Sequence, residues 1–350
     1  AMSGGVDSSV AACLLRESGD EVAGVTMKLF ENADIGQKCQ RSCCSLKDAD
    51  DARAVAAKLN IPFYIFNYSD EFRRQVMARF VLAYRRGLTP NPCIDCNRFL
   101  KFDLLHRRAK GLGFDKIATG HYARIEQDTV SGRNMLLKAA DPAKDQSYVL
   151  YCLTQEQLAD TLFPLGELTK QEVREIAEMR GLINAKKRDS QDICFVPDGD
   201  YAAFIEQYTG ETFPEGDFVG SSGEILGRHR GIIRYTIGQR KGLGLAVKAP
   251  LYVLEKRARD NTVALGFYDE LFSRRVAVED FNFVAAADFK TPCRVKAKIR
   301  YRHAEQPAIA EQTGESTVLL EFDEPQRAVS PGQAAVVYDG DAVLGGGTIC

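Results

Sequence analysis

The residues best suited to chemistry lie at the start of the chain, in the string Ser3-Gly4-Gly5-Val6-Asp7-Ser8-Ser9. Two adjacent glycines allow a tight turn whose backbone N–H groups can approach an anion closely. Asp7 or Ser8 is predicted to cap the helix that follows, and the amino end of a helix attracts phosphate. A Walker loop would add a lysine after its last glycine, and none stands here. The string therefore predicts a phosphate-binding loop that is not centred on the β and γ phosphates.

Three cysteines add possible sulfur or metal chemistry. Cys93 and Cys96 form a Cys-x-x-Cys pair in the proline-rich segment 89–97, and Cys194 lies among carboxylates and aromatics in 189–195. A single Cys-x-x-Cys pair is compatible with a zinc site, a redox dithiol or coincidence. Structural zinc is disfavoured, because the remaining cysteine cluster has an awkward spacing for a second ligand pair (Cys39, Cys43, Cys44).

The other cysteines carry no such signal. Three stand in apolar surroundings and are predicted to be small buried side chains (Cys13, Cys152, Cys293). Cys350 is terminal and is expected to be inert.

Two basic segments could meet a phosphodiester backbone. Segment 294–302 is predicted as a strand, whose period of two would line up five cations on one face (Arg294, Lys296, Lys298, Arg300, Arg302). A row of like charge is unfavourable unless an anion meets it. Segment 228–241 mixes cations with glycines around Tyr235 and suits the same ligand.

The elements that must position these residues alternate between strand and helix up to about residue 195. Strands are predicted over 21–29, 61–67 and 116–119, and helices over 46–59, 71–84, 102–112 and 170–180. This alternation predicts a parallel sheet, in which ligands gather at the carboxyl ends of the strands. Only Ala1 and Met2 precede the loop, so we expect the strand before it to be truncated in this numbering.

Beyond residue 220 short β-branched segments become frequent, at 294–302, 316–322 and 334–338. They predict a small antiparallel barrel or sandwich. We expect domains at 1–197, 198–273 and 274–350, with linkers near 197–200 and near Arg274.

Composition narrows the class of protein. The chain has 350 residues, 45% of them hydrophobic, which is enough for two or three cores. A net charge of −2 argues against nucleic-acid binding by bulk electrostatics alone. No apolar run approaches the roughly 20 residues of a membrane span, and no secretory signal opens the sequence. Ten cysteines without a disulfide-scaffold pattern indicate a reducing compartment, so we expect a soluble, cytoplasmic protein with no membrane partner.

The motifs together carry a resemblance. The string 3–9 resembles the PP-loop of the ATP pyrophosphatases, which cleave ATP between the α and β phosphates. Seven motifs spanning the chain occur in the order seen in the bacterial tRNA-specific 2-thiouridylases, at 3–9, 91–97, 119–122, 144–148, 189–195, 235–242 and 345–347.

This resemblance implies an enzyme that thiolates the wobble uridine of tRNA. ATP with Mg²⁺ would adenylate the carbon-2 oxygen of the uridine, and a sulfur carried by the protein would then displace AMP. It also implies a Rossmann-like PP-loop domain, a small central α+β domain and a C-terminal antiparallel β-barrel. The expected partners are tRNA and an upstream sulfur carrier or cysteine desulfurase.

The resemblance also assigns residues by position. Those expected at ATP are Met2, Ser3, Gly4, Gly5, Val6, Asp7, Ser8, Met27 and Gly120. Those expected at tRNA are Asn91, Pro92, Cys93, His121, Lys144, Asp145, Gln146, Arg300, Tyr301 and Gln333, the first three around the target base. Cys96 matches the nucleophile and Cys194 the residue that accepts a persulfide; the two would form a disulfide when sulfur is delivered.

One position departs from the family pattern. Well-known members carry Asp where this chain has Cys93, so three thiols could converge here (Cys93, Cys96, Cys194). Three thiolates are the usual protein share of a [4Fe–4S] cluster with one open iron. A cluster therefore stands as an alternative to the relay through persulfide and disulfide.

Two other functions remain open from the sequence. The chain could be a PP-loop ligase that adenylates a small molecule, or a non-catalytic, metal-bearing RNA-binding protein. The role of Cys39, Cys43 and Cys44 and the oligomeric state stay undecided.

Overall fold

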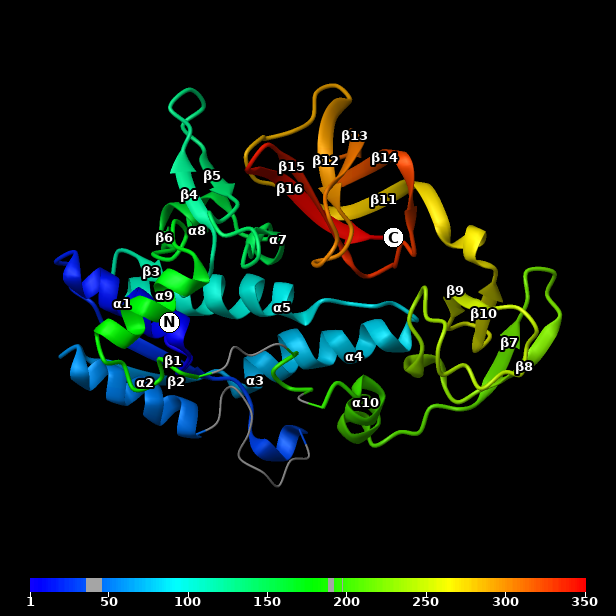
Figure 1. Cartoon of the computed structure of the whole chain (residues 1–350), viewed down its shortest axis with the longest axis horizontal. Helices are drawn as coiled ribbons and strands as arrows, with labels where there is room; N and C mark the ends of the chain where they lie inside the picture. The colour runs from blue at the N-terminus through cyan, green and yellow to red at the C-terminus, as the bar shows by residue number, and fades with distance from the viewer. Residues whose placement is uncertain (36–45, 188–191, 197) are drawn as a thin grey trace. The chain divides into compact units, whose positions relative to one another are not determined.

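The computed structural model describes residues 1–35, 46–187, 192–196 and 198–350 (Figure 1). The chain divides into two compact units. The first unit comprises 1–76, 92–199 and 340–343, and the second comprises 77–91, 200–339 and 344–350.

The first unit is built on short parallel strands. β1 (Gly24–Lys28) pairs with β2 (Phe63–Asn67), and β3 (Ile117–Ala118) pairs with β6 (Thr161–Leu162). Ala1 and Met2 join the two pairs, because Met2 N donates to Val25 O at 2.7 Å and Ala1 N donates to Ala118 O at 2.7 Å. The predicted Rossmann-like parallel sheet is thereby confirmed, with two residues lying where the strand before the loop was expected.

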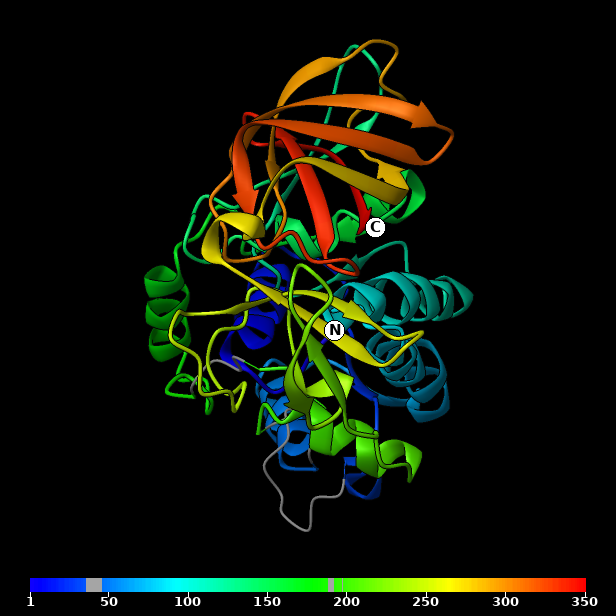
Figure 2. The same ribbon diagram turned by 90° about the vertical axis from the view of Figure 1, so that its right-hand side faces the viewer.

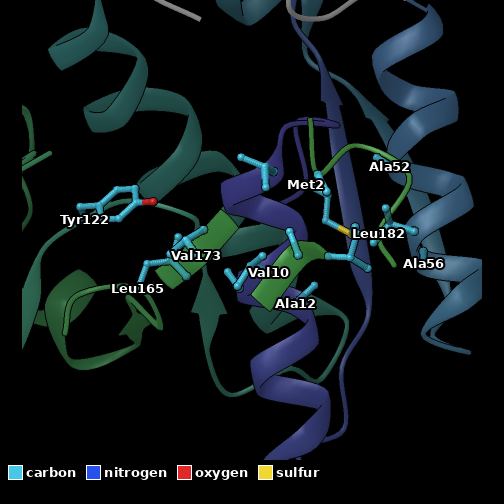
Figure 3. Close-up of a cluster of buried hydrophobic side chains, with 14 of the residues drawn as sticks. Met2, Val10, Ala12, Ala52, Ala56, Tyr122, Leu165, Val173 and Leu182 are labelled. Carbon is cyan, nitrogen blue, oxygen red and sulfur yellow. The ribbon is translucent and has the colours of Figure 1, made fainter. Parts of the chain in front are cut away.

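Three helices cover this sheet and share one apolar core. They are α1 (Val6–Glu17), α2 (Leu46–Lys58) and α9 (Lys170–Met179). Val10 of α1 is fully buried and belongs to the same cluster as Ala52 of α2 and Val173 of α9. Figure 3 shows these side chains around α1, with the Tyr122 hydroxyl directed toward that helix. The glycine-rich loop is therefore attached to a helix whose first two turns are packed into the core.

Two predicted helices are realised with π-helical turns. The segment 71–84 forms α3 (Ser69–Phe72), the π-helix η2 (Arg73–Met77) and α4 (Ala78–Arg85). The segment before 112 forms α5 (Pro92–Asp95), the π-helix η3 (Cys96–Leu104) and α6 (Leu105–Gly111). A π-helix has a wider turn than an α-helix, because its backbone hydrogen bonds join residues five apart rather than four. Helical periodicity in the sequence does not reveal this change.

Smaller elements complete the first unit. They are the 3-10 helix η1 (Asn32–Ile35), the hairpin of β4 (Arg124–Gln127) and β5 (Asn134–Leu137), and the short helices α7 (Ser147–Leu150) and α8 (Gln155–Ala159). The sequence did not predict this hairpin.

The second unit begins with a helix pair and a four-stranded sheet. α4 packs on α10 (Tyr201–Thr209), with the ring centroids of Phe80 and Phe204 6.1 Å apart. The sheet has the order β8 (Ile225–His229), β7 (Gly216–Val219), β10 (Thr262–Gly266), β9 (Tyr252–Arg257). Short 3-10 turns η4 (Ile232–Arg234) and η5 (Tyr268–Leu271) follow β8 and β10.

The second unit ends in the predicted antiparallel barrel (Figure 2). Its strands are β11 (Phe272–Phe283), β12 (Cys293–Lys298), β13 (Gln306–Gly314), β14 (Thr317–Arg327), β15 (Ala334–Asp339) and β16 (Ala342–Ile349). The order is β11-β14-β13-β12-β15-β16, and pairing of β11 with β16 closes the barrel. Arg274, near which a linker was expected, lies within β11.

Among the described residues, no helix combines the length and the apolar composition needed to cross a bilayer.

Candidate active site

The glycine-rich loop leads directly into α1. The helix begins at Val6, Gly5 stands at the capping position, and no side chain caps the described helix end. The predicted capping by Asp7 or Ser8 is therefore wrong, because both lie inside the first turn. Ser8 instead closes the loop on itself: its hydroxyl accepts from Ser3 N at 3.1 Å. The helix end, with its partial positive charge, is thus not satisfied by a side chain of the loop.

Two glycines are required by close packing around this loop. Gly4 has φ +72, and a Cβ there would lie 2.2 Å from the backbone oxygen of Asp48. Gly120 follows β3, and a Cβ there would lie 2.6 Å from Ser8 N. The structure therefore brings Gly120, which the resemblance assigns to the ATP site, against the first turn of α1.

Asp7 binds two side chains from distant parts of the sequence. Its Oδ1 accepts from the Tyr122 hydroxyl at 2.8 Å and from Lys170 Nζ at 2.6 Å. Lys170 is the first residue of α9, and its side chain is 12% exposed. A lysine that the loop's own sequence lacks is thus supplied by another helix.

The inner side of the loop is held by two further residues that sequence reasoning missed. Asn184 Nδ2 donates to Gly4 O and Gly5 O, each at 3.1 Å. Lys187 Nζ lies 3.0 Å from Gly4 O, 2.6 Å from Asp48 Oδ1 and 2.7 Å from Asp51 Oδ2. Burial opposes the charge of Lys187, but its hydrogen bonds to the two carboxylates leave its pKa raised. No local spacing marks these residues, because their partners lie more than a hundred positions away.

Met27 lies in β1, paired in register with Phe66, and is 9% exposed. Its backbone stands near the carboxyl end of the strand, where a bound nucleotide is expected in a parallel sheet.

The Cys-x-x-Cys pair spans the junction of α5 and η3. Cys96 is the first residue of the π-helix and is buried, whereas Cys93 is exposed. Burial raises the pKa of Cys96 to about 11, an increase that the positive charge of Lys101 opposes and that Cys93 and Asp95 reinforce. Although Cys93 is exposed as a residue, the protein around its thiol also raises its pKa. Both thiols thus favour the protonated form, and the positive charge of Lys101 lowers the pKa of each and so partly offsets the effect of burial.

His121 lies beside the same cation. Lys101 Nζ is 3.5 Å from His121 Nε2, and Thr119 Oγ1 is 2.7 Å from Nδ1. Burial, reinforced by Lys101, lowers the pKa of His121 well below its usual value, so the ring is neutral. An ammonium only donates, so Nε2 accepts and the Nδ1 proton is donated to Thr119. The expected functional role of His121 is compatible with this buried, oriented ring.

The remaining cysteines divide as the sequence suggested, with one qualification. Cys152 is buried, with its Sγ 3.7 Å from Ile94 O, and Cys13 is buried in α1. Cys293 is only half-buried. Cys39, Cys43 and Cys44 lie outside the described residues.

Cys194 is half-buried and precedes Phe195, whose ring packs edge-on against Phe72 at 5.6 Å. Across the described residues, no group of three or more His, Cys, Asp and Glu side chains is arranged to hold a metal ion. In the part of the chain that the structure describes, Cys93, Cys96 and Cys194 are not gathered into such a group, and no step is assigned to a [4Fe–4S] cluster.

Three expected tRNA positions precede α7. The Gln146 side chain accepts from Tyr122 N at 2.9 Å, and Asp145 accepts from Ser147 N at 3.1 Å. Lys144 is half-buried. Gln146 and Asp145 thus order the local backbone, and Gln146 is tied to the residue that contacts Asp7.

Four other expected tRNA positions lie in the second unit. Arg300 Nη2 donates to Ala328 O at 2.8 Å and to Ser330 Oγ at 2.6 Å. Gln333 Nε2 donates to Thr89 O at 2.6 Å. Tyr301 is 39% exposed, and Asn91 is half-buried. Pro92, the first residue of α5 in the other unit, is buried. Of these side chains, Tyr301 is the one most open to solvent.

The predicted unbroken row of five cations is wrong. β12 ends at Lys298, so the alternation holds for Arg294, Lys296 and Lys298 but not beyond. Arg300 instead turns toward backbone carbonyls, and Arg294 forms an ion pair with Asp323.

The other basic segment also differs from its prediction. Tyr235 is 2% exposed and packs against Phe218, and Arg234 pairs with Glu206. Arg240 and Lys241 remain exposed. Tyr235 is therefore a core residue, and the exposed cations Arg240 and Lys241 are the residues of this segment that could bind an anion.

Comparison with known proteins identifies the family. Residues 1–198 match the tRNA methyl transferase HUP domain, 202–266 the tRNA methyl transferase PRC-barrel domain, and 273–349 the aminomethyltransferase beta-barrel domain. The chain is 52% identical over 350 residues to the tRNA-specific 2-thiouridylase MnmA of Lachnoclostridium phytofermentans, covering 99% of this chain and 98% of that protein. This chain belongs to the tRNA-specific 2-thiouridylase family.

Other members of the 2-thiouridylase family match over the same length. The protein of Clostridioides difficile is 48% identical, covering 99% of this chain and 96% of its own length. That of Koribacter versatilis is 50% identical, covering 100% and 98%. A solved structure of the U34-tRNA thiolase NcsA from Methanococcus maripaludis with its [4Fe-4S] cluster shows 19% identity and a TM-score of 0.33, over 60% of this chain and 68% of that one. A likeness this weak carries no argument about a cluster here.

Proposed function

We propose that this protein is an ATP-dependent tRNA-uridine 2-sulfurtransferase. The full-length similarity to 2-thiouridylases carries the proposal. In the first step the carbon-2 oxygen of the wobble uridine attacks the α-phosphorus of ATP, and the bond to the β-phosphate breaks. The products are an adenylated uridine and pyrophosphate. Adenylation is needed because a carbonyl oxygen is otherwise a poor leaving group.

ATP is assigned to the loop of Met2 to Ser8 as its Mg²⁺ complex. No side chain caps the amino end of α1 as the structure describes it, so this end is open to an anion. The backbone packs so closely at Gly4 and Gly120 that neither position could hold a larger residue. Mg²⁺ would supply charge neutralisation for the polyphosphate. Met27 and Gly120 would border the adenosine, since both stand at the carboxyl ends of parallel strands.

Sulfur transfer is assigned to Cys194 and Cys96. Cys194 would receive sulfur as a persulfide from a cysteine desulfurase or sulfur carrier. The terminal sulfur then attacks carbon 2, and the carbon–oxygen bond to AMP breaks. The Cys96 thiolate attacks Cys194 Sγ, which releases 2-thiouridine and leaves a Cys96–Cys194 disulfide. A thiol reductant restores both thiols.

Cys96 would act as a nucleophile whose thiol is protonated at rest. Its pKa of about 11 keeps the thiol neutral, and Lys101 opposes that increase. The thiolate is the reactive form, so the adjacent cation favours the state that chemistry requires. Neutral His121 lies within reach of the same ammonium.

The tRNA contacts are assigned to the two groups of expected positions. Asn91, Pro92 and Cys93 would border the target uridine, which must leave its stack to be modified. Further contacts would come from His121, Lys144, Asp145 and Gln146 in the first unit, and from Arg300, Tyr301 and Gln333 in the second. We place the reaction in the cytoplasm, where the tRNA pool lies.

Pyrophosphate release with and without added tRNA tests this function. Release that requires tRNA supports a tRNA-activating enzyme. Release that ignores tRNA but needs a small molecule indicates a ligase. No release under any condition indicates a non-catalytic RNA-binding protein.

A further inference from the structure

The feature that the proposed reaction leaves unexplained is Lys170. Its Nζ lies 2.6 Å from Asp7 Oδ1 in the first turn of α1, at the end where the phosphates are expected. The Lys170 side chain is 12% exposed and that of Asp7 is 31% exposed. The Asp7 carboxylate offsets the charge of this largely buried ammonium at rest. The helix end beside the pair adds partial positive charge, so the group as a whole still favours an anion.

Contacts of Lys170 and of its neighbours fix the position of this lysine. Thr169 caps α9 and forms a reciprocal capping box with Glu172, which sets where the helix begins. The backbone N–H of Lys170 donates to Asp141 Oδ2 at 3.0 Å. The ring of Tyr122 lies 5.9 Å from the ammonium, and the Tyr122 hydroxyl shares Asp7 Oδ1 with it. The ammonium is thus held at the loop before any nucleotide binds.

A purely structural salt bridge explains this placement poorly. Partly exposed ion pairs contribute on the order of 1 kcal/mol, and holding a long side chain in one geometry costs entropy. The same unit also contains a lysine with an evident structural role. Lys187 directs its three N–H groups to Gly4 O, Asp48 and Asp51 and so supports the loop from within. Lys170 instead contacts the carboxylate of the first helical turn.

We infer that Lys170 binds the polyphosphate of ATP and stabilises the charge that develops on the leaving pyrophosphate. This inference rests on the proposed adenylation. As the uridine oxygen bonds to the α-phosphorus, the electron pair of the breaking P–O bond moves to the bridging oxygen, which departs with the β-phosphate. The ammonium offsets this charge without giving up a proton, and so lowers the barrier. Asp7 holds Lys170 at the loop until the phosphates arrive.

The experiment compares two neutral variants with one that keeps the charge. Lys170→Met removes the charge and the hydrogen bond. Lys170→Gln retains a hydrogen-bond donor for Asp7, which protects against misfolding. Lys170→Arg preserves the charge. Lys116→Met is the matched control, because Lys116 donates to Ala159 O in the same unit and has no place in the reaction.

Three readouts separate a phosphate-binding role from a structural one. They are the dissociation constant of a non-hydrolysable ATP analogue with its salt dependence, the rate of tRNA-dependent pyrophosphate release, and the affinity for tRNA. We expect both neutral variants to release pyrophosphate roughly 100-fold more slowly and to bind the analogue about 10-fold more weakly. Their melting temperatures and tRNA affinity should match the Lys116→Met control. Lys170→Arg should recover much of both losses.

Analogue affinity and pyrophosphate release equal to wild type in Lys170→Met or Lys170→Gln would overturn the inference. Equal losses in the charged and neutral variants would overturn it as well, because they would indicate a structural role. If wild type released no pyrophosphate with tRNA, the proposed function would fail instead, and the analogue affinity would still decide the role of Lys170.

Discussion

The hydroxyl of Tyr122 donates a 2.8 Å hydrogen bond to Asp7 Oδ1, although the two residues lie 115 positions apart. Tyr122 is itself held by Gln146, which accepts from Tyr122 N at 2.9 Å and donates its own N–H to Tyr122 O at 2.9 Å. A continuous chain of hydrogen bonds therefore runs from an expected tRNA position to the loop expected to bind ATP.

Replacing Tyr122 by Phe removes the hydroxyl and keeps the buried ring. Asp7 then loses one of the donors that position it against Lys170, so we expect tRNA-dependent pyrophosphate release to fall about 10-fold, in keeping with the roughly 1.5–3 kcal/mol of a hydrogen bond to a charged group. The matched control is Tyr64→Phe, whose side chain is 45% exposed. Equal rates for the two variants would show that the Tyr122 hydroxyl has no part in positioning Asp7.

Gly120→Ala tests the close approach of β3's end to the loop. The added Cβ would lie 2.6 Å from Ser8 N, and backbone atoms on both sides cannot move away cheaply. We expect affinity for an ATP analogue, measured by calorimetry, to fall at least 10-fold. Gly111→Ala is the control, because nothing lies within 4 Å of a Cβ there. An unchanged affinity in Gly120→Ala would mean that this contact does not shape the loop.

The buried thiol of Cys96 makes its reactivity depend on pH. Its pKa of about 11 leaves the native thiol protonated at neutral pH, so the thiolate fraction grows tenfold per pH unit below that value. Alkylation of Cys96 by iodoacetamide, followed by tandem mass spectrometry that distinguishes it from Cys93, should accelerate about tenfold per unit from pH 7 to 10. Lys101→Met should slow it further, since Lys101 lowers this pKa. A plateau in rate below pH 9 contradicts the expectation.

Lys256 makes the second unit more stable at alkaline pH. It is 7% exposed, its Nζ donates to Leu88 O at 3.2 Å, and burial lowers its pKa from 10.5 to about 8. The native state therefore loses this proton at a lower pH than the unfolded chain does. Below about pH 8 both states are protonated and the full cost of the buried charge, about 3 kcal/mol, is present. Between about pH 8 and 10.5 the unfolded state binds the extra proton, and stability rises with pH.

Urea unfolding of wild type and Lys256→Met isolates this contribution. As the pH rises from 7.5 to 10.5, the free energy of unfolding of wild type should increase by about 3 kcal/mol relative to that of Lys256→Met. A difference that stays constant with pH would show that the buried ammonium carries no such cost.

Sequence patterns predicted the parts of this molecule that local rules control. The alternation of strands and helices and the glycines of the loop correspond to the observed parallel sheet and to α1. Lys170 and Lys187 escaped prediction because they reach the loop from elements more than 160 residues away in the chain. Lys101 was not predicted because the sequence pattern does not reveal the π-helix η3, which contains both Cys96 and Lys101.

The errors have equally physical causes. Asp7 does not cap α1, because its carboxylate binds Tyr122 and Lys170 from within the first turn. The basic strand ends at Lys298, and Arg300 turns inward to donate to the backbone carbonyl of Ala328. The sequence pattern could not predict this contact.

Mass spectrometry of tRNA nucleosides after incubation with ATP, a sulfur donor and a reductant tests the central claim most directly. The account predicts 2-thiouridine at the wobble position together with AMP and pyrophosphate. It further predicts that Cys194→Ser forms no 2-thiouridine but still releases pyrophosphate, while Cys350→Ser behaves as wild type. Unmodified uridine with the wild-type protein, or thiolation that survives Cys194→Ser, would contradict it.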